Sequence, residues 1–441
     1  MNPSPRRALR RQWKEHLAMT VLVLSNQTDT LERALNHAGH DVLVCLTEAN
    51  AALRAAIDPP YQVVTVDRWT AYDQIADLAR TLRGHVDQVA TTWEGAIVAA
   101  GLLRDLLDLP GQRTGDAVAA TDKAVMKARL ADAGVPVARH RIVTTIDDIA
   151  VAARDLGWPL VVKPLAGFGS TNTHVVYTLS DLDSMRPVLD KPVAASAFFA
   201  TEPAFTPLTE QRGILVEQYV DIHREYHVDA CWTGGEPVYQ IPGRYNVPPL
   251  AGMGGALGSV LLPADGPEAG PVVRLAEHAA RTLGIRDGFT HTEIYLDYAG
   301  RHIVGEVAAR PGGGGIQRSL HHAYGLDIAT LLAHSAAGQP IKADLRPRPG
   351  VYGWVGPYVP DGTITTIGAP EAIERQPGVI EATVKAKTGG VGGMTGTGLW
   401  AGAAGYAFLR GSTVEHVLQL MPRAVEAFAI RVTPTRPELL R

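Results

Sequence analysis

Cysteine, net charge and long apolar segments are all scarce in this sequence. Its 441 residues include only Cys45 and Cys231, whose wide separation fits neither a disulfide framework nor a metal site. The formal net charge of −4 gives no electrostatic basis for binding nucleic acid or an anionic membrane. No run approaches the roughly 18 apolar residues that a membrane helix needs. We therefore expect a cytoplasmic protein without nucleic-acid or membrane partners.

Signals of other protein classes are missing as well. Residues 1–19 are basic but have no apolar core of a signal peptide, so we expect a short extension before a domain that begins near Met19. No G-x-G-x-x-G fingerprint follows the first apolar run, VLVLS (21–25), which argues against a dinucleotide enzyme. Hydrophobic residues make up 46% of the chain and charged residues 20%, the balance of an ordinary globular enzyme.

The pattern of the sequence changes near residue 120. Residues 20–115 alternate short apolar runs with helical stretches, which predicts a doubly wound parallel sheet. Beyond that point, WPLVVKPLAGFGSTNTHVVYT (158–178) is typical of two hairpin strands joined by a Gly/Ser/Thr loop. FTHTEIYLDY (289–298) and GEVAARPGGGG (305–315) are strand-like and each contains a carboxylate. The sequence therefore predicts an α/β protein that is α+β in parts.

Lys163 ends an apolar strand directly before the glycine-rich turn AGFGST (166–171). Its ammonium, the free N–H groups of the turn and the hydroxyls of Ser170 and Thr171 suit a phosphate. A hairpin whose lysine extends to solvent accounts for the same residues equally well. The turn is not a Walker A loop, because the lysine precedes the glycines. Lys123, at the start of a helical stretch, is by itself typical of a solvated lysine.

Glu293 and Glu306 lie in two strand-like segments joined by a short turn at 297–300. A hairpin puts such carboxylates on one face, where they repel unless a cation lies between them. Oxygen ligands beside a nucleotide suit Mg²⁺, and Arg310 is placed to hold an anion next to that metal. The alternative is a structural acid pair with Arg310 as its counter-ion.

Glu217 and Glu225 follow a predicted strand in VEQYVDIHREY (216–226). Such a segment can serve as a hinge whose backbone contacts a purine, with Glu225 accepting from ribose hydroxyls. Taken alone, both acids are more typical of surface charges at a strand edge.

The ordered set of these motifs resembles the ATP-grasp superfamily of carboxylate–amine ligases over about residues 20–435. DK with AGVP, VVKP with a glycine loop, VEQYV with REYHVD, and HTE with GEVAARPGG occur in family order. The pattern is more similar to L-amino acid ligases than to biotin carboxylase, because a longer lid loop and a glutamate-rich bicarbonate site are missing.

The resemblance implies roles for individual residues. Lys123 and Lys163 would contact ATP phosphates, Lys163 and Arg310 would be catalytic, and Glu293 and Glu306 would hold Mg²⁺ or Mn²⁺. The implied nucleotide-binding positions in the lid loop, adenine hinge and ribose site are Lys123, Lys163, Gly167, Gly169, Ser170, Thr171, Glu217, Gln218, Tyr219, Val220 and Glu225. One position departs from the family, since Ala308 stands where an Asn metal contact is often found.

The resemblance also implies a domain layout and a substrate region. The expected parts are an extension (1–19), a Rossmann-like domain (20–115), a connecting helix (116–138), a mobile lid (139–212), an antiparallel ATP and metal core (213–345) and a C-terminal subdomain (346–441). The weaker substrate-binding candidates are Arg244, His291, Gly312, Gly313 and Arg318. Partners would be a small carboxylate and a small amine, and a homodimer is compatible with the pattern.

The implied reaction is ATP-dependent amide formation through an acyl phosphate, with an amino acid as one substrate. Two alternatives stay open at this point. One is a carboxylase or formyl-transfer relative of purine biosynthesis with the same ATP site. The other is an ATP-binding module without turnover, for which Ala308 is the motivation.

Overall fold

The computed structural model describes residues 18–26, 28–54, 61–193, 202–393 and 402–434. These form two compact units, the first from the chain up to residue 114 with residues 329–341, the second from residues 115–328 and 342 onward. Most of the predicted extension, residues 1–17, lies outside the described residues. Among the helices described, none is both long and apolar enough to cross a membrane.

The first unit is built on a parallel sheet with strand order β3-β2-β1-β4, as predicted. Its strands and helices are β1 (Thr20–Leu24), α2 (Thr30–His37), β2 (Asp41–Thr47), α3 (Glu48–Arg54), β3 (Gln62–Val66), α4 (Tyr72–Leu82), β4 (Gln88–Thr91) and α5 (Ile97–Leu107). Side chains of β1 alternate between two apolar clusters. Leu22 and Leu24 pack with α4 and α5, whereas Val21 and Val23 pack with α2 and with Ala333 of α12 (Ile328–Ala336).

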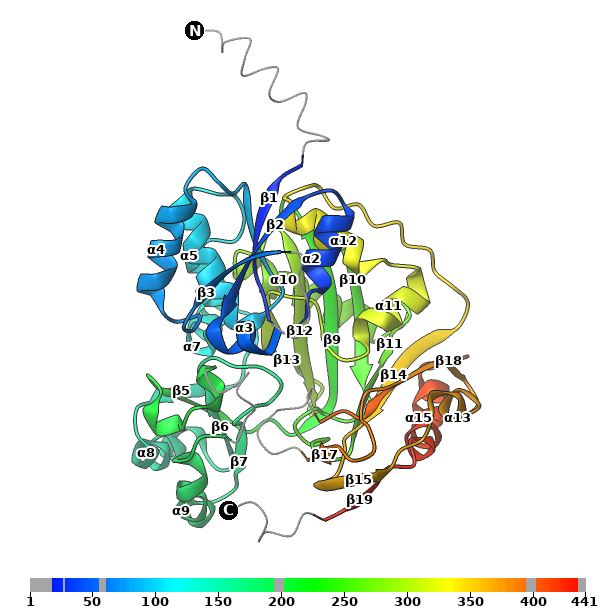
Figure 1. The fold of residues 1–441 in the computed structure, drawn as a ribbon. Helices are drawn as coiled ribbons and strands as arrows, with labels where there is room; N and C mark the ends of the chain where they lie inside the picture. The colour runs from blue at the N-terminus through cyan, green and yellow to red at the C-terminus, as the bar shows by residue number, and fades with distance from the viewer. Residues whose placement is uncertain (1–17, 27, 55–60, 194–201, 394–401, 435–441) are drawn as a thin grey trace. The chain divides into compact units, whose positions relative to one another are not determined.

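The second unit contains a small antiparallel sheet of order β5-β8-β6-β7 (Figure 1). Its elements are β5 (His140–Val143), α8 (Ile146–Leu156), β6 (Leu160–Pro164), β7 (His174–Val176), α9 (Leu179–Leu189) and β8 (Ile214–Gln218). β6 and β7 pair antiparallel, which confirms the predicted hairpin over 158–178. β8 also lies in this sheet, although the predicted lid ended at residue 212.

The rest of the second unit surrounds an antiparallel sheet of eight strands, in the order β13-β12-β9-β10-β11-β14-β18-β16 (Figure 1). These strands are β9 (Ile222–Thr233), β10 (Glu236–Tyr245), β11 (Ala256–Leu261), β12 (Gly288–Asp297), β13 (His302–Ala308), β14 (Val351–Pro357), β16 (Val379–Val384) and β18 (Gly405–Gly411). The accompanying helices are α6 (Thr114–Ala119), α7 (Lys123–Asp132), α10 (Ala269–Thr282), α11 (Ile316–Tyr324), α13 (Pro370–Glu374) and α15 (Val414–Ala427). A three-stranded sheet adds β15 (Gly362–Thr366), β17 (Val391–Gly392) and β19 (Arg431–Thr433).

A short break separates two helices, since α11 ends at Tyr324 and α12 begins at Ile328. Gly325 adopts φ +71 and donates its N–H to the carbonyl of His321, which ends the helix in the left-handed conformation that glycine adopts easily. The break separates α11, which is in the second unit, from a segment that packs in the first.

Candidate active site

One pocket of the second unit brings together most of the predicted site residues. It lies between α7, the small sheet and strands β9, β12 and β13 of the large sheet. The predicted residues that line it are Lys123, Lys163, Gly167, Gly169, Ser170, Thr171, Glu217, Gln218, Tyr219, Val220, Glu225, His291, Glu293, Glu306 and Arg310. Residues from segments almost 190 positions apart in the chain, such as Lys123 and Arg310, therefore share one cavity.

The two carboxylates of the β12–β13 hairpin lie directly opposite each other in register, Glu293 against Glu306. Directly opposed side chains in an antiparallel pair project from the same face, with Cβ atoms roughly 5 Å apart. The register shifts beside this pair, because Gly305 is an extra residue on β13. A side chain at Gly305 would place its Cβ 2.4 Å from the ring of Tyr295. The bulge that orients Glu306 therefore requires glycine.

Lysines surround these acids on the side of the small sheet. Lys123 Nζ lies 2.8 Å from Glu306 Oε1 and 2.7 Å from the carbonyl oxygen of Gly167. Lys163 Nζ lies 2.7 Å from Glu217 Oε2. Burial lowers the pKa of Lys163, but the Glu217 and Glu306 carboxylates outweigh burial and raise it. The ammonium groups of Lys123 and Lys163 therefore each lie against a carboxylate of the pocket.

Glu217 has a second lysine partner that the sequence analysis missed. Lys127, one helical turn after Lys123 on α7, places its Nζ 2.6 Å from Glu217 Oε1 and 3.2 Å from the carbonyl oxygen of Gly305. Burial would raise the pKa of Glu217, but Lys127 and Lys163 lower it to about 2. Residues four apart share a helix face, so the spacing Lys123 to Lys127 was a usable signal.

The turn after β6 adopts conformations that suit glycine and small polar residues. Gly169 and Ser170 have φ values of +59 and +57, and Gly167 approaches Ala204 so closely that an added Cβ would lie 2.6 Å away. The Thr171 hydroxyl is buried and has no hydrogen-bond partner within the described parts of the chain. An anion in the pocket would supply the missing acceptor for this hydroxyl.

Glu225 and Tyr245 also line the pocket, beside Glu293. Burial raises the pKa of Glu225 well above its ordinary value, and the Glu293 carboxylate raises it further. Burial would raise the pKa of Glu293, but His291 and then Arg310 lower it. The Tyr245 hydroxyl lies 3.3 Å from His291 Nε2. Two neighbouring carboxylates with opposite pKa shifts are typical of a site that holds a cation or polar ligand.

Not all of the predicted substrate residues face this pocket. Arg244 pairs with Glu268 at 3.2 Å and with Glu415 at 3.3 Å, and Arg318 pairs with Glu381 at 2.8 Å. Successive residues of a strand point to opposite faces, so it is the neighbouring Tyr245 that lines the cavity and not Arg244. Neither arginine is among the residues that line the pocket.

Gly312 and Gly313, which were also predicted to bind substrate, are not among the residues that line the pocket. The N–H of Gly312 donates to Asp229 Oδ1 at 2.9 Å, and the carbonyl oxygen of Gly313 accepts from Ile316 at the start of α11. Ala308 lines the pocket and lies opposite His291 in the β12–β13 register. The imidazole of His291 thus projects from the strand position facing the alanine that replaces the family's asparagine.

The pocket residues fit both implied ligands on chemical grounds. Paired carboxylates are the oxygen ligands that Mg²⁺ prefers, usually together with phosphate oxygens. The two lysines and the unsatisfied Thr171 hydroxyl supply cations and a donor for those phosphates.

Comparisons with known proteins show which families this chain is similar to. Residues 122–231 match the family described as carbamoyl-phosphate synthase L chain, ATP binding domain. The chain is 28% identical over 308 residues to the L-arginine-specific L-amino acid ligase of Bacillus subtilis, a match covering 70% of this chain and 71% of that protein.

Solved structures show the same fold. The L-amino acid ligase from Bacillus licheniformis superposes with a TM-score of 0.70 and 19% identity, over 96% of this chain and 100% of that one. A carboxyaminoimidazole ribonucleotide synthase from Aspergillus clavatus, complexed with ATP, gives a TM-score of 0.65 and 16% identity, over 94% and 99% of the two chains. These matches agree with the resemblance to the ATP-grasp superfamily that the sequence motifs indicate, and this chain shares the fold of the solved structures. Both L-amino acid ligases belong to the class of enzyme that the sequence predicted for this chain, an ATP-dependent ligase that forms carbon–nitrogen bonds.

Proposed function

We propose that this protein joins the carboxylate of an amino acid to the amine of a second amino acid, using ATP and Mg²⁺. The observation that carries the proposal is the convergence of Lys123, Lys163, Glu293, Glu306 and Arg310 on one pocket. Similarity to L-amino acid ligases over most of the chain supports the substrate class. The carboxylase alternative has only a shared fold in its favour.

Activation of the substrate carboxylate is the first chemical step. A carboxylate oxygen attacks the γ-phosphorus of ATP and forms the acyl phosphate. The bond between the γ-phosphorus and the oxygen that links it to the β-phosphate breaks, and ADP leaves. Lys123 and Lys163 neutralise charge on the transferring phosphoryl group. Glu293 and Glu306 would hold Mg²⁺, which would offset negative charge on the phosphates.

Amide formation is the second step. The neutral amine attacks the acyl carbon and a tetrahedral oxyanion forms. The bond from carbon to the phosphate oxygen then breaks, and the proton that the nitrogen loses leaves with the phosphate. Arg310 lies at the pocket end of the hairpin and is the cation that we assign to this oxyanion. The loop over residues 166–171 would cover the phosphates and exclude water, which would otherwise hydrolyse the acyl phosphate.

Nucleotide contacts complete the proposal. Gln218, Tyr219 and Val220 directly follow Glu217 and line the pocket, and we assign them to the adenine. Glu217 itself is held by two lysines, so its contribution is to their placement. Glu225 is assigned to the ribose.

A coupled assay with mass detection tests the function. The protein is incubated with ATP, Mg²⁺ and pairs of amino acids, and ADP and condensed products are followed together. We expect ADP and dipeptide in equal amounts, and only when both substrates are present. Turnover that requires bicarbonate or formate in place of an amine would contradict the proposal, as would ATP binding without ADP release under every substrate pair.

A matched pair of variants then ties the reaction to the pocket. Glu306→Gln removes one of the two opposed carboxylates, whereas Glu236→Gln makes the same chemical change at an exposed position paired with Arg281. ADP formation should fall by at least about 100-fold in the first variant and stay at the wild-type rate in the second.

A further inference from the structure

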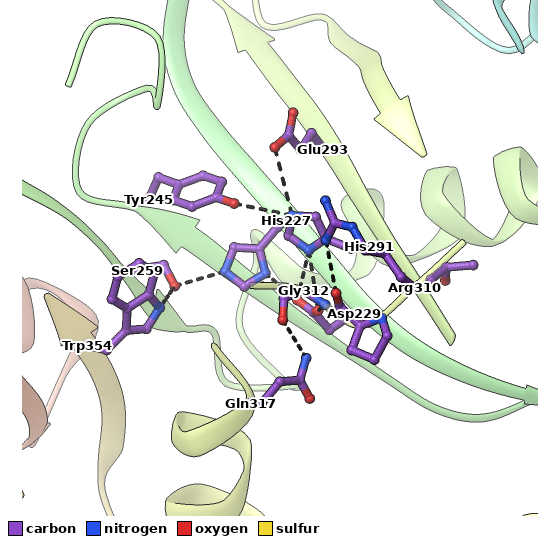
Figure 2. A network of polar contacts seen from close by, with 12 residues as sticks. His227, Asp229, Tyr245, Ser259, His291, Glu293, Arg310, Gly312, Gln317 and Trp354 are labelled. Carbon is purple, nitrogen blue, oxygen red and sulfur yellow. Dashed lines mark hydrogen bonds and ion pairs between the residues drawn. The ribbon is translucent and has the colours of Figure 1, made fainter. Parts of the chain in front are cut away.

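A buried network of polar side chains extends from the pocket into the large sheet, with Asp229 at its centre (Figure 2). Asp229 Oδ2 accepts from His227 Nδ1 at 2.7 Å, and Oδ1 accepts from the N–H of Gly312 at 2.9 Å. His291 Nδ1 lies 3.3 Å from both carboxylate oxygens. One carboxylate therefore connects strand β9, strand β12 and the glycine loop that follows Arg310.

Asp229 fixes the proton position on the near side of His227, because an ionised carboxylate only accepts and Nδ1 must therefore donate to Oδ2. On the far side of the ring, Nε2 lies 3.0 Å from Ser259 Oγ, which also accepts from Trp354 Nε1 at 2.9 Å. All three partners of Asp229 are thus N–H donors.

Two glycines allow the backbone to pass close to the side chains of this network. A Cβ at Gly312 would lie 2.3 Å from Asp229 Oδ1, and a Cβ at Gly243 would lie 2.3 Å from His227 Nε2. Gly243 is the direct cross-strand neighbour of His227, as His291 is of Asp229. The backbone on two sides of Asp229 and His227 approaches too closely for any other residue.

Among the three groups that contact Asp229, His291 lines the pocket. Its Nε2 lies 3.3 Å from the Tyr245 hydroxyl and 3.8 Å from Glu293 Oε1, while its Nδ1 faces Asp229 (Figure 2). The contact between Nδ1 and Asp229, on the side of the ring away from Glu293, therefore orients the imidazole.

We propose that Asp229 is a positioning residue, which holds His291 and the backbone of Gly312 in one fixed relation so that the imidazole and Arg310 face the same reacting centre. The proposal rests on the ligase function proposed above. Because Asp229 lies behind these groups and does not line the pocket, it acts through them and not on the substrate.

Asp229→Asn tests this role with little change in size. An amide offers one acceptor oxygen and turns an N–H₂ toward the other donors, so it cannot satisfy the three partners of Asp229 together. We expect kcat for dipeptide formation to fall about 100-fold, the loss that a small misplacement of reacting groups causes. The KM for ATP should stay within about twofold, because the nucleotide-facing residues do not contact Asp229.

Thr290→Val is the matched control. Thr290 is the neighbour of His291 on β12, is equally buried, and accepts a hydrogen bond of 2.9 Å from Trp232 Nε1. Removing its hydroxyl breaks one buried hydrogen bond outside the network, so it should lower stability and leave kcat unchanged.

A second readout does not depend on catalysis. Amide hydrogen exchange, followed by mass spectrometry over residues 309–317, should be faster at Gly312 in Asp229→Asn by about tenfold or more and unchanged in Thr290→Val. If the wild-type protein forms no dipeptide, the proposed function fails, while this exchange result still decides whether Asp229 anchors the loop.

Two results would overturn the proposal. The first is wild-type kcat or wild-type loop exchange in folded Asp229→Asn. If that variant does not fold, Gly312→Ala pushes the loop away from Asp229, and wild-type kcat there has the same meaning. The second is one equivalent of transition metal in the purified protein that is lost in Asp229→Asn, since ligand atoms of His227, Asp229 and His291 lie within 4.8 Å of one another.

Discussion

A substitution at Lys127 tests whether this lysine neutralises the buried Glu217 carboxylate when ATP is bound. In the structure both oxygens of Glu217 are paired, one with Lys127 and one with Lys163. If Lys163 moves to a phosphate of bound ATP, Lys127 is the cation that stays with the buried carboxylate. Lys127→Met keeps the length of the side chain and removes its charge.

The size of the effect follows from the burial of these groups. Glu217, Lys127 and Lys163 are all buried, and the pKa of Glu217 falls from 4.5 to about 2. That fall corresponds to roughly 3 kcal/mol of favourable interaction, shared by the two lysines. Removing one partner of a buried ion pair costs about 3–5 kcal/mol, and Lys163 still pairs with Glu217 in the free variant. In Lys127→Met, ATP binding would draw Lys163 away and leave Glu217 without a partner. We therefore expect ATP binding to be weaker by about 3 kcal/mol, the lower end of that range.

Steady-state kinetics with ATP varied measures this competition. A loss of about 3 kcal/mol is a decrease of about 100-fold in kcat/KM for ATP. Urea unfolding of the free protein should show a smaller loss. Lys342→Met, a change at an exposed lysine, serves as the control and should leave both quantities unchanged. Wild-type kcat/KM for ATP in folded Lys127→Met would refute the reasoning.

Three other predictions follow from single side chains. Thr171→Val removes the buried hydroxyl without a partner in the described structure, so the KM for ATP should rise about tenfold, and an unchanged KM would argue that no phosphate reaches it. Arg244→Gln should leave kcat unchanged and lower the temperature of half-unfolding, because Arg244 pairs with two carboxylates. A tenfold fall in kcat would indicate that Arg244 contacts the substrate after all. Because the folded-state pKa of Glu217 lies below its ordinary value, its contribution to stability is complete above pH 4.5 and is lost as the pH falls toward 2. Urea titrations of wild-type protein and Glu217→Gln should therefore converge over that pH interval, and a gap that stays constant would contradict the ion pairing.

The sequence was informative wherever local pattern sets the geometry. The run from Glu293 to Glu306 contains two strands and a four-residue turn, so the pairing of the two carboxylates was predictable from hairpin register. The hairpin over 158–178 was predictable for the same reason.

Features that depend on distant contacts were not predictable. Asp229 meets Gly312 across 83 positions of the chain, and no local pattern indicates that contact. The placement of Arg244 depends on which face of β10 turns to the pocket, and this is fixed by the pairing of β10 with β9 and not by its own sequence. Lys127 and the alternation Glu225, His227, Asp229 along β9 were signals that the periodicity of helix and strand made available.

The division of the chain into two units has a consequence for its synthesis. Val21 and Val23 on β1 are covered by Ala333 and Ala337, which are made more than 300 residues later. During synthesis, one apolar face of the sheet in the first unit therefore lacks part of its cover until residues 329–341 are made. The residues that line the pocket are all synthesised before that point. A nascent chain arrested before residue 329 should bind a hydrophobic dye or a chaperone, and release it once residues 329–341 are added.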